Sequence, residues 1–263
     1  MPSELGITVL VSVGRHPVTG RYRRADQDAR AVEMALGLSL NNNISSLEVL
    51  HAGDASEASL REYLGMGIGR LEVISQSPYA DVVPAIAKHL ERNLPRIVLT
   101  GVTAEQGESS GMLPYLLAES LGWPMVNNIA EIEEIKNGEA SILQALPRGQ
   151  RRRIKVKLPF VASVDKAAEA PRQIAYIRSR DGEIVEASAP TEPDSKLASW
   201  EMVPAKKRPK RLKVVKAKTA ADRFKAATAK SEAKGGQVMQ DPSPEEAAKA
   251  IISLLREEGV LRR

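Results

Sequence analysis

The chain has 263 residues, a formal net charge of +5 and no cysteine. This length allows one α/β core with an appendage, and the absence of thiols excludes disulfides, thiolate catalysis and an iron–sulfur cluster held by this chain. No apolar run approaches the roughly 20 residues that span a bilayer, and the first residues lack the pattern of a secretory signal. We therefore expect a cytoplasmic protein that is not inserted in a membrane.

The positive charge is concentrated in one segment. Between residues 206 and 234, twelve Lys or Arg stand against two acidic residues, so the rest of the chain is net acidic. A basic run can bind nucleic-acid phosphates, but this one contains a single aromatic, Phe224, and only 3% of the whole chain is aromatic. We interpret the segment as a solvated arm or a tail that contacts a protein partner, and we expect no nucleic acid.

The first half of the chain alternates strand and helix patterns. Strands are predicted over 7–13, 47–51, 71–74 and 97–99, and helices over 28–38, 56–66, 81–93 and 113–121. Ser56 is expected to cap the second helix, and a polar stretch ending at Arg24 indicates a hairpin after the first strand. Strands separated by helices form right-handed βαβ units, which predicts a doubly wound, mostly parallel, Rossmann-like sheet covered on both faces.

After Pro124 the pattern changes to consecutive strands. Strands are predicted over 129–135, 139–146, 153–158 and 160–164, with turns at Asn137-Gly138 and Arg148-Gly149. Antiparallel additions of this kind are common on a parallel sheet.

A Pro- and charge-rich linker over 190–209 separates the core from a C-terminal arm. We therefore divide the chain into a nucleotide-binding core, 1–189, and an arm, 190–263. A helix closes the arm, since Ser243 to Glu246 supply an N-cap, a first-turn proline and a capping-box glutamate, and Gly259 stops it. Its apolar stripe must bury on this core or on a partner; the stripe consists of Ala247, Ala248, Ile251, Leu254 and Leu255.

The stretch that most directly indicates a binding site is 96–124. A buried strand is followed by a polar loop, which leads to Ser109-Ser110-Gly111 and then to a helix. This arrangement points free backbone N–H groups and a helix dipole at one place, as nucleotide-phosphate sites in open α/β sheets do. The competing interpretation, which the stretch alone favours slightly, is that Ser109 simply caps the helix.

Independent enzyme activity finds little support in the residues. The three histidines, His16, His51 and His89, fall in different elements, and no Gly-x-Ser-x-Gly elbow is present. No GxxxxGK phosphate loop and no paired metal-ligand spacing occurs either. We expect no catalytic residues and no metal.

Taken in order, several motifs resemble the beta subunit of electron transfer flavoproteins. Residues 31–35 are similar to that family's Ala-Val-Glu-Glu-Ala helix, and 118–124 resemble its A-x-x-L-G-W-P helix end. Further similarities to family segments occur at 60–70, 97–101, 155–165 and 236–259. The motifs are collinear over nearly the whole chain, which is what makes the resemblance persuasive.

The resemblance implies a subunit that buries an adenine nucleotide, usually AMP, in its own sheet crevice. By position, Ser12 and Ala52 would line the adenine side. The residues that would stand where the family's Asn-Gln-Thr-Gly wraps the phosphate are Gly107, Glu108, Ser109, Ser110 and Gly111. Free amides and hydroxyls suit a phosphate, whereas Glu108 would repel it unless its side chain points away.

The resemblance also implies a partner, a homologous alpha subunit that holds a redox-active FAD. His16 and Gln27 occupy the positions of the family's flavin-proximal aromatics, so we expect them near that FAD. The competing interpretation is that His16 only forms a turn and Gln27 only begins a helix. The family's partner-recognition loop is rewritten over 166–178, which keeps only Ala170-Pro171-Arg172.

We therefore expect the beta subunit of a heterodimeric electron transfer flavoprotein, with the arm wrapping the alpha subunit. Its FAD would carry electrons from a dehydrogenase to a quinone-linked acceptor of the respiratory chain, so the chain would be an electron-carrier subunit and not an enzyme. The alternative is a non-redox adenine-nucleotide-binding interaction protein whose basic arm binds an acidic partner or nucleic acid.

Overall fold

The structure is a computed structural model that describes residues 5–41, 44–189, 191–201, 203–205, 219–221, 224 and 239–257. The chain divides into two compact units, 1–202 and 203–263, and each is treated by itself. The predicted basic segment, 206–234, lies outside the described residues except at 219–221 and 224, and the predicted helix stop at Gly259 also lies outside them. Among the described helices, none is long and apolar enough to cross a membrane.

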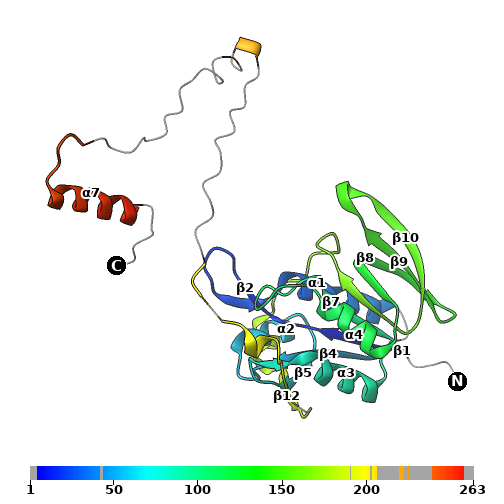
Figure 1. The fold of residues 1–263 in the computed structure, drawn as a ribbon. Helices are drawn as coiled ribbons and strands as arrows, with labels where there is room; N and C mark the ends of the chain where they lie inside the picture. Colours follow the sequence, from blue (N-terminus) through cyan, green and yellow to red (C-terminus); the bar gives the residue numbers. More distant parts are fainter. Residues whose placement is uncertain are drawn as a thin grey trace. The chain divides into compact units, whose positions relative to one another are not determined.

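A nine-stranded sheet with helices on both faces forms the first unit (Figure 1). Seven strands, in the order β8-β11-β7-β1-β4-β5-β12, run parallel, and β9 and β10 extend the β8 edge as antiparallel strands. This confirms the predicted doubly wound, mostly parallel sheet with antiparallel additions. The strands are β1 (Leu5–Leu10), β4 (Ile44–Gly53), β5 (Arg70–Ser75), β7 (Ile97–Gly101), β8 (Met125–Lys136), β9 (Glu139–Ala145), β10 (Arg151–Lys157), β11 (Phe160–Val164) and β12 (Glu183–Ala187).

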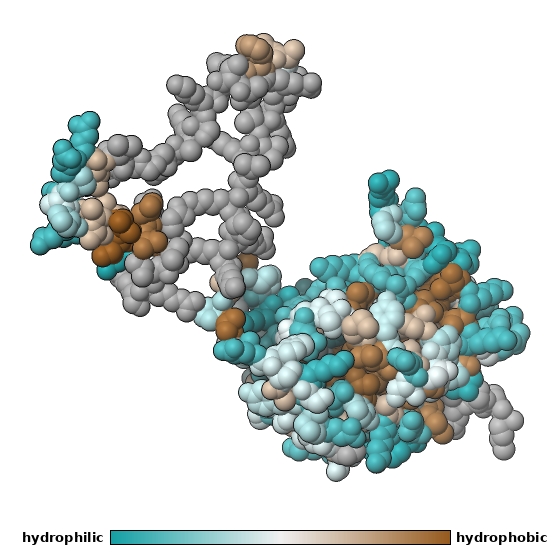
Figure 2. Space-filling model, in the orientation of Figure 1, coloured by the Kyte–Doolittle hydropathy of each residue, from teal (hydrophilic) through white to brown (hydrophobic). Residues whose placement is uncertain are grey.

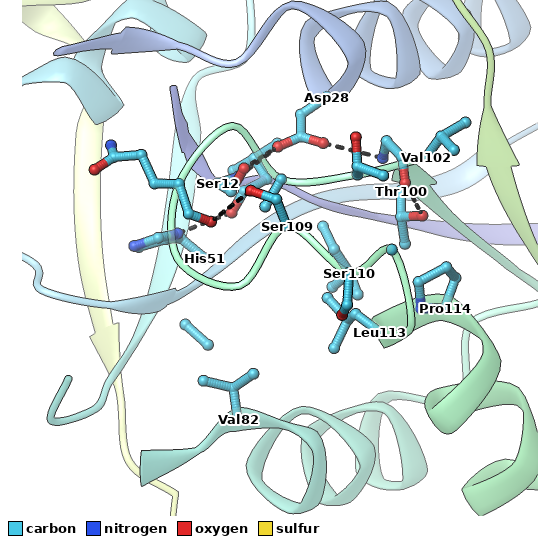
Figure 3. A pocket seen from close by; sticks show the side chains of 18 of the residues that line it. Ser12, Asp28, His51, Val82, Thr100, Val102, Ser109, Ser110, Leu113 and Pro114 are labelled. Atoms are coloured by element: carbon cyan, nitrogen blue, oxygen red, sulfur yellow. Dashed lines mark hydrogen bonds between the residues drawn. The ribbon is translucent and has the colours of Figure 1, made fainter. Parts of the chain in front are cut away.

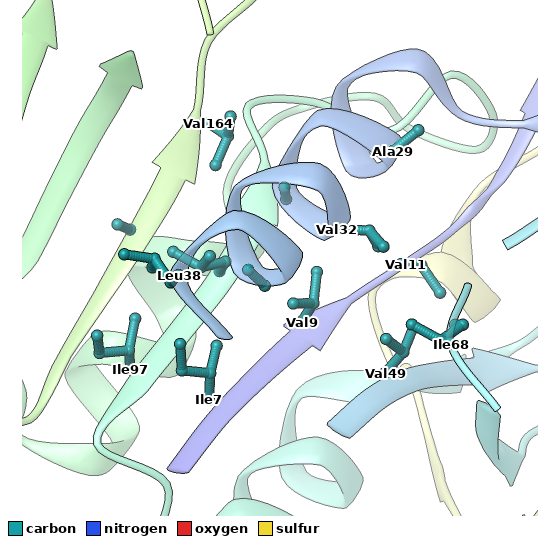
Figure 4. Close-up of a cluster of buried hydrophobic side chains, with 14 of the residues drawn as sticks. Ile7, Val9, Val11, Ala29, Val32, Leu38, Val49, Ile68, Ile97 and Val164 are labelled. Atoms are coloured by element: carbon teal, nitrogen blue, oxygen red, sulfur yellow. The ribbon is translucent and has the colours of Figure 1, made fainter. Parts of the chain in front are cut away.

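Alternation along the strands assigns each helix to one face of the sheet. Ile97 and Leu99 belong to the buried cluster that contains α1 (Asp26–Asn41) and α2 (Arg61–Leu64), whereas Val98 belongs to the cluster with α3 (Val82–Asn93) and α4 (Leu113–Leu121). Successive strand side chains point to opposite faces, which produces this division. Figure 4 shows Ile7 and Val9 of β1 pointing toward α1.

The order of connections creates a switch point between β1 and β7. The chain leaves β1 through α1 to β4 and then through α2 to β5, all on one side of β1. It returns through α3 to β7, which pairs with β1 on the other side. In open α/β sheets, ligands bind outside the carboxyl ends of the strands at such a point.

Two small pairings complete the first unit. The predicted hairpin is confirmed as β2 (Val13–Arg15) and β3 (Tyr22–Arg24), so the first strand ends at Leu10 rather than Val13. The other pairing joins β6 (Ala80–Asp81) to β13 (Glu192–Pro193).

Two further local predictions were wrong. In place of a helix over 56–66, a 3-10 turn, η1 (Ala58–Leu60), leads into the single turn of α2, and Glu57 rather than Ser56 accepts the capping bond, from the Ser59 amide. Ser56 donates instead to Asp54. The stretch after Tyr176 was not predicted as regular structure, yet it forms α5 (Tyr176–Asp181) and the edge strand β12. The remaining short helical turns are η2 (Pro147–Gly149) and η3 (Leu197–Ser199).

The second unit contains the predicted terminal helix, α7 (Pro244–Glu257). Its capping box is formed as expected: the Ser243 amide donates to Glu246 Oε2 at 3.0 Å, and the Glu246 amide donates to Ser243 Oγ at 3.4 Å. Ile251 is 58% and Leu254 54% exposed, and Figure 2 shows apolar side chains gathered along this helix. Within the second unit, taken by itself, these two side chains of the stripe are therefore exposed.

Candidate functional site

A cavity of about 280 Å³ lies at the carboxyl ends of β1, β4 and β7, at the switch point. One side is apolar, with Val82 and Ile86 from α3 and Leu113 and Pro114 at the start of α4. Figure 3 shows Val82 and Leu113 on the side opposite Ser12 and Asp28. An apolar slot with a few polar groups at one end suits a planar aromatic base that carries a polar tail.

Asp28, in the first turn of α1, is buried at the polar end of the cavity. Its Oδ2 accepts hydrogen bonds from the Ser12 amide (2.7 Å) and hydroxyl (2.5 Å), and its Oδ1 accepts from the Gly101 amide (3.0 Å). Burial raises the pKa of Asp28 to about 6, against the opposing effect of these bonds. The carboxyl group thereby ties the ends of β1 and β7 together.

His51, at the end of β4, contributes an acceptor to the lining. Its Nδ1 lies 2.8 Å from the Val11 carbonyl oxygen, and since a carbonyl only accepts, Nδ1 carries the proton. Burial lowers the pKa of His51, so the imidazole is neutral near neutral pH. Its Nε2 is then an acceptor suited to an amino or amide donor of a bound ring.

The loop between β7 and α4 forms the mouth of the cavity. Gly107, Ser109 and Gly111 all have positive φ, of 72°, 52° and 71°. At Gly111 a Cβ would lie 2.8 Å from the Val102 carbonyl oxygen, so only glycine fits. The loop therefore folds tightly back on itself.

The interpretation of Ser109 as the helix cap was wrong. Helix α4 has Met112 at its N-cap position, with no side-chain capping bond. The Ser109 hydroxyl donates to the Gln106 carbonyl at 3.4 Å, and the Ser110 hydroxyl accepts from the Met112 amide at 3.4 Å. Positive φ is uncommon for a serine, and such backbone strain often accompanies binding sites.

The structure brings together most of the residues predicted to bind the nucleotide. Six of them line the cavity: Ser12, Ala52, Glu108, Ser109, Ser110 and Gly111. Gly107 belongs to the same loop but lies outside the lining. Among the described residues that line the cavity there is no lysine or arginine, whereas two carboxyl groups, those of Asp28 and Glu108, are present. Sequence reasoning missed Asp28 and Thr100, which look like ordinary helix-start and strand residues, and took His51 as structural.

The two residues predicted near the flavin lie outside the cavity and bond to nearby backbone. His16 Nδ1 accepts from the Val18 and Thr19 amides and closes the tip of the β2–β3 hairpin. Gln27 Oε1 accepts from the Val102 and Thr103 amides, so Gln27 anchors the cavity loop. Their proximity to a flavin stays a prediction.

A second polar cluster lies on the α3 face of the sheet. Glu48, Glu72 and His89 have ligand atoms within 4.8 Å of one another. His89 Nε2 already donates to Glu48 at 2.7 Å, and Thr8 donates to the same carboxylate at 2.8 Å. Although burial raises the pKa of Glu48, the bonds from His89 and Thr8 hold it below its usual value. We interpret the cluster as a hydrogen-bonded link between the sheet and helix α3.

The fold and the cavity together define a doubly wound α/β protein with a nucleotide-type crevice at its switch point. Residues 18–192 match the family model described as Electron transfer flavoprotein domain. An electron transfer flavoprotein subunit beta from Chromohalobacter salexigens is 53% identical over 265 residues, which cover 100% of this chain and 98% of that protein. A putative electron transfer flavoprotein subunit of Escherichia coli, YgcR, is 29% identical over 164 residues, 59% of this chain and 61% of that one. The chain therefore belongs to the electron transfer flavoprotein family, as a beta subunit.

Proposed function

We propose that this chain binds AMP in the cavity at the switch point and assembles with an alpha subunit that holds FAD. In this role it is one half of a heterodimeric electron carrier between a dehydrogenase and a quinone-linked acceptor. The observation that carries the proposal is the cavity itself, whose lining unites six residues assigned independently from the sequence.

The residues present fit an adenine nucleotide. Val82 and Leu50 offer apolar surface for the base, and His51 Nε2 offers an acceptor for its exocyclic amine. Ser109, Ser110 and the Leu113 amide at the start of α4 would hold the phosphate. The next residue, Pro114, has no N–H, and the Tyr115 amide already donates to the Met112 carbonyl. Among its described residues, the cavity lining contains no lysine or arginine, so the phosphate would be held by neutral donors of the loop and not by a cationic side chain.

Glu108 makes the phosphate end sensitive to charge. It lines the cavity on the loop that would meet the phosphate, so its carboxylate repels a bound dianion. We expect Glu108→Gln to tighten AMP binding by about three- to tenfold at low salt, the size of one like-charge contact near water, and by less at high salt. Calorimetric titration of the nucleotide-depleted chain measures it, with Glu119→Gln on the exposed side of α4 as the control. An unchanged or weaker affinity would show that Glu108 points away.

Toward the flavin, this chain offers the β2–β3 hairpin. When bound, FAD supplies the redox chemistry, and the protein tunes it through nearby charge and hydrogen bonds. His16 Nδ1 is engaged in the turn, and among the described residues nothing bonds Nε2, which leaves that nitrogen for an outside group.

His16 can be tested without destroying the turn. An asparagine side chain also accepts from amides two or three residues ahead, so His16→Asn keeps the turn acceptor and removes the imidazole, whereas His16→Ala removes both. We expect both variants to shift the reduction potential of the flavin in the assembled heterodimer by more than ~15 mV. For comparison, about 59 mV corresponds to a tenfold change in the equilibrium constant of a one-electron couple. A smaller shift in both removes His16 from the flavin site.

A further inference from the structure

The loop that lines the cavity carries one carboxylate that faces the opposite way. Glu105 lies outside the lining and reaches the β2–β3 hairpin and the start of α1. Its Oε2 accepts from the Arg15 amide at 2.9 Å and its Oε1 from the Asp26 amide at 3.0 Å. Arg23 Nη2 lies 3.1 Å from both oxygens. One side chain thus joins three segments.

Other contacts of the loop reinforce the same junction. Gln106 Nε2 donates to the Val13 carbonyl at 3.1 Å. At Gly14 a Cβ would lie 2.8 Å from Glu105 Oε2 and 2.7 Å from Ala25 Cα, so loop and hairpin touch with no space between them. The cavity loop and the hairpin therefore form one contiguous body.

The pairing of the hairpin's own strands does little to fix its position. It pairs over only three residues a strand, and two-stranded ribbons of this size are unstable alone. Other anchors include Glu62, which accepts from the Arg24 amide, and Tyr63, whose hydroxyl accepts from the Ala25 amide. Arg24 Nη2 also donates to the Arg172 carbonyl at 2.8 Å, and Val13 packs against the core. Hydrogen bonds to an ionised carboxylate are roughly twice as strong as neutral ones, so Glu105 is a principal anchor of the hairpin.

The hairpin also presents an exposed surface. Val18 at its tip is 87% exposed and Tyr22 is 57% exposed. Apolar side chains at the tip of a small ribbon are suited to contact with another chain. A segment that meets a partner at one end and the cavity loop at the other can transmit binding between them.

We propose that Glu105 couples ligand binding in the cavity to the position of the β2–β3 hairpin. A ligand that orders the loop 102–111 stabilises the hairpin through Glu105, and a partner that holds the hairpin tightens ligand binding by the same factor. The choice of AMP as the ligand rests on the proposed function. If Glu105 were only a fold-stabilising ion pair, the hairpin would not respond to the ligand.

The test is amide hydrogen exchange in the assembled heterodimer, with and without saturating AMP. The reporters are His16 and Gly20, whose amides bond within the hairpin to Arg21 and His16 carbonyls and not to Glu105. We expect AMP to slow their exchange by about tenfold or more, within the usual range of coupling between sites. Glu105→Ala should abolish the response while AMP still binds.

Glu62→Ala is the matched control, because it removes a carboxylate that anchors the same hairpin from outside the cavity loop. This variant should speed hairpin exchange overall but keep the AMP response. If AMP binds the wild type and leaves His16 and Gly20 unchanged, the coupling is overturned while the proposed function stands.

Failure of AMP to bind would overturn the proposed function, and the coupling is then decided in the ligand-free protein. There, Glu105→Ala should speed exchange in the loop 102–111 as well as in the hairpin, whereas Glu62→Ala should affect the hairpin alone. Unchanged loop exchange in Glu105→Ala would refute the coupling.

Discussion

Raising the pH from 4 to 8 should lower the unfolding free energy of the wild type by about 2 kcal/mol more than that of an Asp28→Asn variant, because the unfolded carboxyl group is already largely ionised at pH 4. The pKa of Asp28 rises from 3.8 to about 6 on folding, and each unit corresponds to about 1.4 kcal/mol. Because the folded chain binds more protons than the unfolded chain between these values, the stability from protonated Asp28 is complete below pH 4 and lost as the pH rises through 6.

Urea unfolding at submicromolar chain concentration, followed by far-ultraviolet circular dichroism, measures this difference. The asparagine variant carries a constant penalty, since its amide meets the Ser12 donors, but that penalty does not depend on pH. The pKa values of Glu33 and Glu48 are lowered on folding, so these residues make the chain more stable as the pH rises. Both residues are present in the wild type and in the variant, and their contribution cancels in the comparison. If the unfolding free energies of the two proteins changed equally with pH, the carboxyl group of Asp28 would have the same pKa in the folded and the unfolded chain.

Charge on the apolar stripe of α7 should prevent assembly with the alpha subunit. Ile251 and Leu254 are exposed in this chain, and burying each would contribute roughly 1.5–3 kcal/mol. Ile251→Asp or Leu254→Asp loses that contribution and forces a carboxylate into an apolar contact. We expect each to weaken the heterodimer by at least about 100-fold, or 2.7 kcal/mol.

Ser253→Asp is the control, since it adds the same charge to an exposed polar position of the same helix. Affinity from biolayer interferometry against the immobilised alpha subunit separates the cases. Equal losses in all three variants would indicate a general charge effect, and no loss in any of them would place the stripe outside the interface.

Most of the fold followed from hydrophobic periodicity. Ile97 to Leu99 predicted a buried strand because parallel strands are apolar on both faces. The strand β12 was missed because its sequence, Glu183 to Ala187, carries two acidic residues at a half-exposed sheet edge. The helix over 56–66 failed at its N-terminal half, where Ala58–Leu60 form a 3-10 turn and only Arg61–Leu64 form one α-helical turn, while the apolar spacing of Leu60 and Leu64 still resembles a longer helix.

The site was predicted in part. Residues next to strand ends, such as Ser12 and Ala52, are placed by the sheet, so chain position located them at the cavity. Asp28 and Glu105 act through contacts across 73 to 90 residues of sequence, with Gly101 and Arg15 respectively. No local pattern distinguishes such carboxylates from solvated ones, which is why the sequence did not mark them.

The nucleotide content of the purified heterodimer tests the central claim most directly. Denaturing extraction followed by chromatography should yield AMP and FAD in equal amounts from the wild type. An Ala52→Phe variant, which fills the cavity from β4, should retain FAD and lose AMP. A second FAD in place of AMP would indicate an electron-bifurcating type. Extraction of no adenine nucleotide besides FAD, or the same AMP content in Ala52→Phe, would contradict the assignment of AMP to this cavity.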